Sequence, residues 1–196
     1  LEARGHVAGV ITQNVDGLHR QAGSQRVIDL HGRADVVRCM GCGALRRRHD
    51  LHDELGELNP DWLELGANVA PDGDADLERD FADFRVPSCG RCGDGIWKPD
   101  VVFFGDSVPR DTVEEAFSLL DECRGLLVVG SSLMVYSGYR FARRAARDGK
   151  PMACLNLGRT RADALFDLKV TTSAETGLTA LLEVLEEKAL RPADRA

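Results

Sequence analysis

The chain has 196 residues, of which 43% are hydrophobic, so it can bury a sizeable core and hold one domain with a small module. Its apolar runs are far shorter than the ~20 residues that a membrane helix needs, and no signal-peptide pattern opens it. We therefore expect a cytoplasmic protein without a membrane partner. The formal charge of −7 is concentrated in residues 50–86, where twelve acidic residues outnumber two arginines, which argues against nucleic-acid binding through this segment.

Four short runs that are apolar at nearly every position predict strands buried on both faces of a parallel sheet. These runs are residues 6–12, 125–130, 151–158 and 168–172. Helical patterns occupy residues 111–123, 137–149 and 176–190. Ser137 is expected to cap the second helix and Gly149 to end it, while Val113, Phe117 and Leu120 share one face of the first. The alternation predicts an α/β fold, Rossmann-like, with a doubly wound parallel sheet whose strand ends and ligand lie along one edge.

Residues 33–99 do not follow the alternation of strands and helices. They contain the acidic segment 50–86, turn-rich phrases such as "APDGDAD" and two CxxC pairs. We interpret them as a small zinc-ribbon module with an acidic insertion. The rest of the chain, residues 1–32 and 100–196, then forms the α/β domain.

Both cysteine pairs are followed by glycine, which gives CxxCG twice, at residues 39–43 and 89–93. The four candidate ligands are Cys39, Cys42, Cys89 and Cys92. Four thiolates complete the tetrahedral shell of one structural zinc ion, although an iron–sulfur cluster and a redox dithiol are the alternatives. Because disulfides are disfavoured in the cytosol, Cys123 and Cys154 are interpreted as small buried apolar residues.

Polar residues follow three of the predicted strands. "TQNVDGLHRQAG" at residues 12–23 follows the first, "GSS" at 130–132 the second and "NLG" at 156–158 the third. Each has an ordinary alternative, such as a polar turn capped by Asp16 or a common strand-to-helix turn. Together they suggest a dinucleotide that lies across the sheet edge.

His31 lies eight positions before Cys39. It would be a fifth candidate ligand for a filled zinc shell, so we do not expect it to bind zinc. Composition alone favours a buried core histidine over one that performs chemistry.

The phrases "TQNVDGLHRQAG", "DLHG", two CxxC pairs, "KPDVVFFGD", "GSSLMVYSG" and "NLG", in this order, closely resemble the sirtuins, which are NAD-dependent protein lysine deacylases. The phrases "APDGDAD", "KPDVVFFGD" and "VYSGYRF" look most like the branch that contains the mitochondrial sirtuin with weak deacetylase activity and its bacterial relatives. The resemblance covers nearly the whole chain.

The resemblance implies roles for individual residues. His31 matches the catalytic base, with Asn14 and Asp16 beside it in the catalytic set. The positions that match NAD contacts are Gln13, Asn14, Val15, Asp16, Gly130, Ser131, Ser132, Asn156, Leu157, Gly158 and Ala174. The positions that match the segment pairing with the acyl-lysine peptide as an added strand are Val101, Val102, Phe103, Phe104 and Gly105. For one of the two phenylalanines, strand alternation favours a place in the core.

In the family's reaction the acyl oxygen attacks the nicotinamide ribose, nicotinamide leaves, and a ribose hydroxyl then loses a proton, which an imidazole can accept near neutral pH. The resemblance thus implies a transferase that produces nicotinamide, free lysine and O-acyl-ADP-ribose. Protein ADP-ribosyl transfer and a non-catalytic zinc-ribbon or NAD-binding scaffold are the alternatives.

Two departures from the family's pattern stand out. The glycine-rich "GAGxS" turn would precede Leu1, so we expect the N-terminal part of the NAD-binding domain to be missing and the chain alone to bind NAD poorly. Ala174 occupies a position where many relatives have an adenine-contacting cysteine, which leaves only a backbone contact there.

Overall fold

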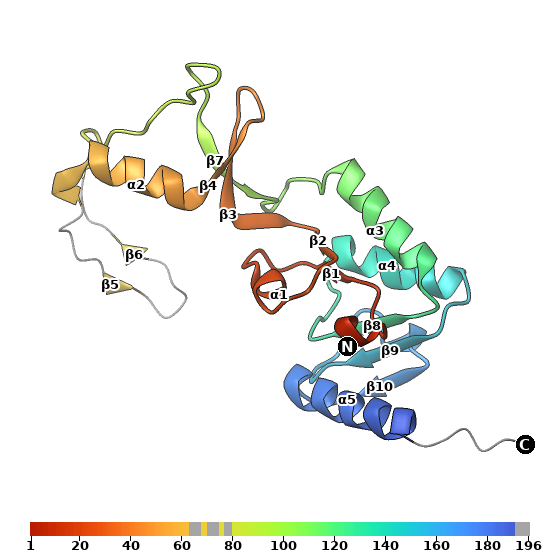
Figure 1. Ribbon diagram of the computed structural model, residues 1–196. Helices are drawn as coiled ribbons and strands as arrows, with labels where there is room; N and C mark the ends of the chain where they lie inside the picture. The colour runs from red at the N-terminus through yellow and green to blue at the C-terminus, as the bar shows by residue number, and fades with distance from the viewer. Residues whose placement is uncertain (63–67, 70–74, 77–79, 191–196) are drawn as a thin grey trace, which may run out of the picture. The chain divides into compact units, whose positions relative to one another are not determined.

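The computed structural model describes residues 1–62, 68–69, 75–76 and 80–190, which divide by their contacts into two compact units (Figure 1). The first, here called the α/β unit, comprises Leu1–Asn14, Leu18–His31 and Phe104–Ala196. The second, here called the cysteine unit, comprises Val15–Gly17 and Gly32–Phe103. Among the described residues, no helix has both the length and the apolar character needed to span a bilayer.

The α/β unit contains two parallel sheets. One is formed by β1 (Val10–Thr12) and β2 (Val27–Asp29), with Thr12 opposite Asp29. The other has the strand order β10-β9-β8 and contains β8 (Leu126–Val129), β9 (Met152–Leu155) and β10 (Leu168–Val170). The Rossmann-like α/β fold with parallel strands is therefore confirmed, but the described strands belong to two sheets. Each strand is also shorter than its apolar run, since pairing extends only as far as the neighbouring strand does.

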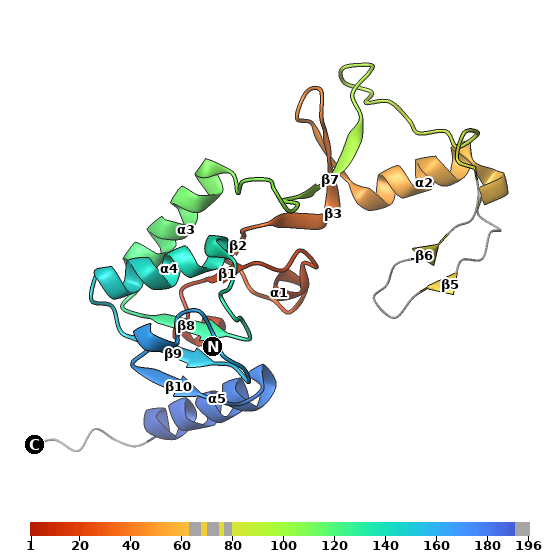
Figure 2. The same cartoon turned by 180° about the vertical axis from the view of Figure 1, so that it is seen from behind.

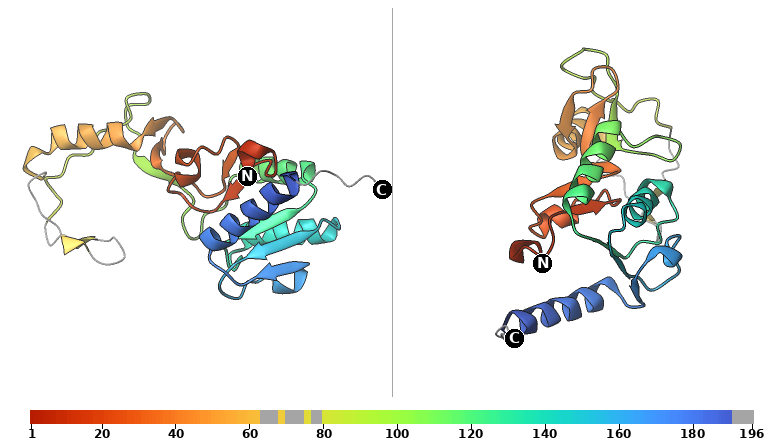
Figure 3. Two further views of the ribbon diagram at one scale, coloured as in Figure 1. Left: turned by 60° about the horizontal axis from the view of Figure 1, so that its bottom comes forward. Right: turned by 90° about the vertical axis from the view of Figure 1, so that its right-hand side faces the viewer.

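Helices cover both faces of the larger sheet. Figures 1 and 2 show α4 and α5 on opposite sides of it, and Figure 3 (left) shows the blue helix α5 lying across its strands. The helices of the unit are α1 (Leu18–Gln21), α3 (Arg110–Glu122), α4 (Tyr136–Arg147) and α5 (Ala174–Leu190). The short 3-10 helices are η1 (Glu2–Arg4) and η3 (Asp163–Leu165).

The ends of α4 test the predicted helix signals. Gly149 has φ 65° and its N–H donates to the Ala146 carbonyl, so the glycine stop is confirmed. The predicted cap is wrong, because Val135 occupies the N-cap position and makes no side-chain capping hydrogen bond. Ser137 instead lies inside the first turn and is buried. Its hydroxyl is therefore available for a contact outside the helix.

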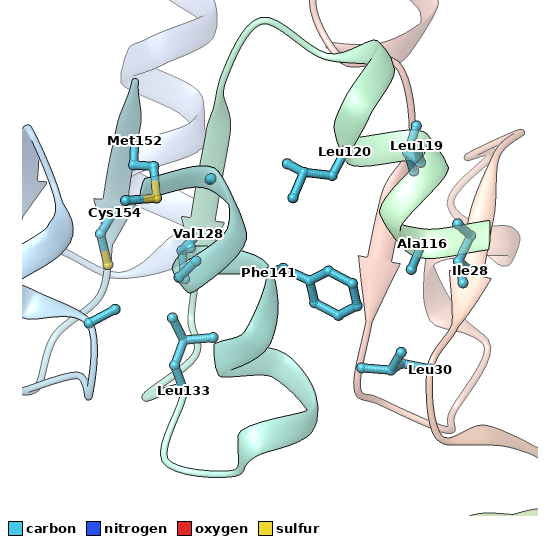
Figure 4. Packing of buried hydrophobic residues seen from close by; sticks show 13 residues of the cluster. Ile28, Leu30, Ala116, Leu119, Leu120, Val128, Leu133, Phe141, Met152 and Cys154 are labelled. Carbon is cyan, nitrogen blue, oxygen red and sulfur yellow. The ribbon is translucent and has the colours of Figure 1, made fainter. Parts of the chain in front are cut away.

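The core of the α/β unit joins α3 and α4 to both sheets (Figure 4). In this view Phe141 of α4 lies between Val128 and Leu133 on one side and Leu30 and Ala116 on the other. The buried residues of this core are Ile28, Leu30, Ala116, Leu119, Leu120, Val128, Leu133, Phe141, Ala142, Ala145, Met152, Cys154 and Ala162. Cys154 is fully buried, as predicted, while Cys123 is half-buried just after α3.

Truncation of Phe141 should destabilise this core strongly. The side chain is only 4% exposed and its ring centroid lies 4.9 Å from that of Phe117. We expect Phe141→Ala to lower the free energy of unfolding by about 3–5 kcal/mol in urea denaturation. The control is Leu157→Ala, because Leu157 is 69% exposed and should change stability by less than about 0.5 kcal/mol. Equal effects of the two substitutions would contradict the described core.

The cysteine unit is built on an antiparallel sheet with the order β4-β3-β7, whose strands are labelled in Figure 1. Its strands are β3 (Gly32–Cys39), β4 (Leu45–Arg47) and β7 (Trp97–Val101). The other elements are α2 (Arg48–Leu58), η2 (Pro60–Trp62) and the paired strands β5 (Asn68–Val69) and β6 (Ala75–Asp76). Parts of the acidic segment, residues 63–67, 70–74 and 77–79, lie outside the described residues.

Candidate active site and metal centre

The turns after β1 and β2 bring Gln13 and His31 together. The strands pair up to Thr12 and Asp29, and the Leu30 N–H then donates to the Thr12 carbonyl (2.9 Å), which keeps the two chain segments adjacent beyond the strands. His31 Nε2 lies 2.8 Å from Ser137 Oγ of α4. Gln13 Nε2 donates to the same hydroxyl oxygen (3.3 Å). A buried serine therefore joins the two predicted site residues.

Gln13 also connects this group to the loop after β8. Its Oε1 accepts a hydrogen bond from Ser131 Oγ (3.2 Å), and Ser131 Oγ accepts one from the Leu133 N–H (3.2 Å). Ser132 is exposed and its carbonyl accepts from the Arg161 N–H (2.8 Å), while Gly130 is exposed at the end of β8. The structure thus links Gln13, Ser131 and His31 through side chains, and leaves the Ser132 hydroxyl at the surface.

The other predicted NAD positions of the α/β unit lie near the ends of β9 and β10. Asn156 Nδ2 donates to the Gly158 carbonyl (3.0 Å), which folds the turn after β9. Leu157 and Gly158 are exposed, and Ala174 is exposed at the first residue of α5. These positions offer backbone groups and one amide side chain rather than charges.

Asn14, Val15 and Asp16 follow Gln13 directly. Asn14 is exposed, and its N–H donates to Thr12 Oγ1 (3.1 Å). Val15 and Asp16 belong to the cysteine unit, where the Val15 carbonyl accepts from the Ala34 N–H (2.8 Å). Asp16 is exposed.

The environment of His31 keeps its imidazole neutral. Burial lowers the pKa of His31 below its ordinary value of 6.5, and the positive charge of Arg140 lowers it further. A hydrogen bond to the backbone of Gln13 opposes these effects without reversing them. At neutral pH the ring therefore has a free lone pair, as a general base requires.

The segment 101–105 presents aromatic side chains to solvent. Strand β7 ends at Val101, Val102 is half-buried, and both Phe103 and Phe104 are exposed. The expectation that alternation buries one phenylalanine is therefore wrong, because the alternating strand stops before it reaches them. Lys98 Nζ lies 4.6 Å from the centroid of the Phe103 ring, and Gly105 turns the chain with φ 92°.

The four predicted metal ligands gather at one point of the cysteine unit. The sulfur atoms of Cys39, Cys42, Cys89 and Cys92 all lie within 4.8 Å of one another. The Cys39–Cys92 and Cys42–Cys89 Sγ–Sγ distances are 3.6 and 3.8 Å. A tetrahedron with Zn–S bonds of about 2.3 Å has edges of about 3.8 Å, whereas a disulfide would need about 2.05 Å. The cluster is consistent with a structural zinc site.

The glycine after each cysteine pair turns the backbone beside the cluster. Gly43 and Gly93 have φ of 70° and 90°, and their N–H groups donate to the carbonyls of Cys39 and Cys89. Hydrogen bonds from the backbone of Cys92 and Arg91 lower the pKa of Cys89 to about 7. Burial raises the pKa of Cys92 to about 11. A bound cation would stabilise the thiolate form of all four sulfurs.

Gly95 should be essential to this cluster. A Cβ on Gly95 would lie 2.1 Å from Cys39 Sγ and 2.8 Å from Cys92 Sγ, so Gly95→Ala has to displace ligand sulfurs. We expect that variant to retain less than about a tenth of the zinc of the parent protein, measured by atomic emission after desalting. The control is Gly90→Ala, because a Cβ on Gly90 meets nothing within 4 Å. Full zinc content in the Gly95→Ala protein would contradict the described packing.

Sequence reasoning did not identify two of the residues around His31. Ser137 was interpreted as a helix cap, since a serine before a helical pattern most often has that role. Arg140 lies about one turn later on α4, which carries several arginines, and such a pattern is typical of a helix face exposed to solvent. Only the folded chain brings these residues to His31.

Comparisons with known proteins agree with this arrangement. The model of the Sir2 family matches residues 1–137. The chain is 57% identical over 183 residues to NAD-dependent protein deacetylase 2 of Bradyrhizobium diazoefficiens, covering 93% of this chain and 67% of that protein. It is 58% identical over 182 residues to NAD-dependent protein deacetylase of Xanthomonas campestris pv. campestris, covering 92% of this chain and 62% of that protein.

A solved structure described as "Sir2-p53 peptide-NAD+" superimposes with a TM-score of 0.71 at 30% identity, covering 97% of this chain and 67% of that one. The chain thus spans between 62% and 67% of the length of these relatives. The sequence match and the structural match each cover more than nine-tenths of this chain. Together with the family model, they show that the chain belongs to the Sir2 family, the sirtuins.

Proposed function

We propose that the protein carrying this chain is an NAD-dependent protein lysine deacetylase. The observation that carries the proposal is the position of the His31 imidazole, which Ser137 and, through the same hydroxyl, Gln13 hold at the ends of β1 and β2. Relatives that match over more than nine-tenths of the chain are named NAD-dependent protein deacetylases, which supports the same activity here.

The residues at the strand ends fit a dinucleotide in their chemistry. Exposed hydroxyl and backbone groups follow β8 at Ser132, and an amide and exposed backbone follow β9 at Asn156 and Gly158. Such donors suit phosphate and ribose oxygens, and parallel strands place them at one edge. We assign NAD to this edge, with Gln13, Asn14, Val15 and Asp16 on the nicotinamide side and Ala174 on the adenine side. Bound NAD would supply the ADP-ribose group to which the acyl group is transferred, with release of nicotinamide.

In this proposal His31 is the general base. Its burial and the charge of Arg140 keep it unprotonated at neutral pH, so its ring nitrogen can accept a proton from a ribose hydroxyl. Asn14 and Asp16 complete the proposed catalytic set, as the resemblance to the sirtuins implies.

The acyl-lysine peptide is assigned to residues 101–105. The backbone after β7 continues beyond its paired strand, and an extended peptide can add to such a segment through main-chain hydrogen bonds. The exposed rings of Phe103 and Phe104 offer apolar contacts to a peptide or to the lysine chain. Zinc has a structural role in the cysteine unit, and the α/β unit is the NAD-binding domain. We place the protein in the cytoplasm.

The deciding experiment incubates the full-length protein with NAD and an acetyl-lysine peptide and records the mass of the peptide. Loss of one acetyl group supports deacetylation, while a gain of ADP-ribose identifies an ADP-ribosyltransferase. An unchanged peptide together with NAD binding by calorimetry identifies a non-catalytic scaffold. Either of the last two results would overturn the proposal.

A further inference from the structure

The hydroxyl of Ser137 contacts the Nε2 nitrogen of His31. Ser137 Oγ lies 2.8 Å from His31 Nε2, although 106 positions separate the two residues in sequence. Ser137 is only 7% exposed and lies in the first turn of α4, so its backbone is held by the helix. The hydroxyl is therefore fixed at the imidazole edge and is not a mobile surface group.

The hydrogen bonds around Ser137 have one direction. The Leu133 N–H donates to Ser131 Oγ, and the Ser131 hydroxyl donates to Gln13 Oε1. The opposite end of the same amide, Gln13 Nε2, can only donate, and its acceptor is Ser137 Oγ (3.3 Å). The proton of the Ser137 hydroxyl is thus free to be donated to His31 Nε2.

This direction selects one state of the imidazole. If Nε2 is unprotonated, every donor in the series has an acceptor and Ser137 accepts one hydrogen bond and donates another. If Nε2 carries a proton, Ser137 Oγ must accept hydrogen bonds from both Gln13 and His31. The proton of the Ser137 hydroxyl then no longer has His31 Nε2 as its acceptor. Loss of a buried hydrogen-bond partner is unfavourable, so the network favours the tautomer with a lone pair on Nε2.

We propose that Ser137 is a positioning residue for His31: in the free protein its hydroxyl donates to Nε2 and holds the imidazole in place with this nitrogen unprotonated, and a substrate hydroxyl replaces it there before the proton is transferred. The proposal rests on the proposed deacetylase function, in which His31 is the base. It gives Ser137 a role in the reaction that differs from helix capping and from core packing.

The close packing of the Gln13 side chain against α4 holds its amide beside Ser137. The residue after Ser137 is Gly138, and a Cβ there would lie 2.7 Å from Gln13 Oε1 and 3.0 Å from Gln13 Nε2. Any larger residue at this position would push the Gln13 amide away from Ser137. The pair Ser137–Gly138 therefore provides both the hydroxyl and the space that the amide needs.

Charged groups near His31 act in the same sense. Arg140, one turn after Ser137 on α4, disfavours a second positive charge on the imidazole. On the side of β2, Asp29 is paired with Arg20 (2.8 Å) and is thereby neutralised. The hydrogen bond to the backbone of Gln13 acts in the opposite direction, because it favours protonation of the ring, but it does not reverse the effects of burial and Arg140.

The kinetic test compares Ser137→Ala with Ser137→Thr in the full-length protein. Without the hydroxyl, the neutral imidazole of the free enzyme loses a donor, so the midpoint of the rising limb of the kcat/KM–pH profile should move up by about 0.5–1 pH unit. At pH values below that midpoint kcat/KM should fall several-fold, while kcat stays within about twofold of the parent value. Ser137→Thr keeps the hydroxyl and should restore the parent midpoint. A parent-like profile in Ser137→Ala would overturn the proposal.

The second measurement does not require a variant at Ser137 to fold. Nitrogen-15 NMR of the parent protein at neutral pH should show an unprotonated Nε2 for His31, whose signals are identified by their loss in His31→Asn. A protonated Nε2 would refute the proposal, whatever the kinetics show. Failure of the parent protein to deacetylate any peptide would instead refute the proposed function, and the NMR result would still decide on the contact itself.

Discussion

Replacement of His31 with alanine in the full-length protein should lower the rate of deacetylation by about 10²–10⁴-fold, as removal of a general base usually does. The physical reason is that the variant lacks the imidazole that the structure holds against Ser137 at the ends of β1 and β2, and the neighbouring hydroxyl and amide groups are too weakly basic to accept a proton near neutral pH. Loss of the acetyl group from a peptide, followed over time at saturating NAD, measures the effect.

The control for this variant is His52→Ala. His52 is an exposed histidine on α2 of the cysteine unit, so its replacement should leave the rate within about twofold. Thermal denaturation of both variants should show parent-like folding. If His31→Ala keeps more than about a tenth of the parent rate, His31 is not the base.

The pH dependence of the parent protein follows from the same contacts. The rate rises with pH through the pKa of His31, because only the neutral ring accepts a proton. Burial and Arg140 keep this pKa below the ordinary value of 6.5, so the rising limb should be centred below pH 6.5 and the rate should be on its plateau at neutral pH.

Loss of one zinc ligand should unfold the cysteine unit. Metal binding to a four-cysteine site contributes folding free energy of about 10–16 kcal/mol in small zinc domains, which is as large as the whole stability of a typical domain. We expect Cys39→Ser to reduce zinc from one equivalent to less than about a tenth, and to make the segment 32–103 sensitive to proteolysis. Atomic emission and limited trypsin digestion measure the two effects.

Cys123→Ser is the matched control, because Cys123 is a half-buried cysteine of the α/β unit and does not belong to the cluster. It should keep one equivalent of zinc and the parent digestion pattern. Equal zinc content in the two variants would show that the four sulfurs do not hold the metal.

The sequence predicted the parallel strands and the metal cluster because both depend on local patterns. The apolar runs at 125–130 and 151–158 contain β8 and β9. Each CxxCG motif likewise forms a tight turn whose glycine has a positive φ, so the motif alone predicts the local structure. The ends of the strands were not predictable, since they depend on a partner that is distant in sequence. For the same reason the description of one continuous sheet was too simple.

The site was predicted less completely. Composition alone favoured a core role for His31, and its proposed chemistry came from the resemblance of whole motifs. Ser137 reads as a helix cap in any local window, and only the packing of α4 shows that it contacts His31. The exposure of Phe103 and Phe104 depends on where β7 ends. The sequence of these two residues does not show where the strand ends.

The most direct test of the central claim is the product balance of the full-length protein with NAD and an acetyl-lysine peptide. Chromatography with mass detection should find deacetylated peptide, nicotinamide and O-acetyl-ADP-ribose in equal amounts, and none of them when peptide or NAD is left out. Deacetylated peptide that appears with free acetate and without nicotinamide would contradict an NAD-dependent transfer.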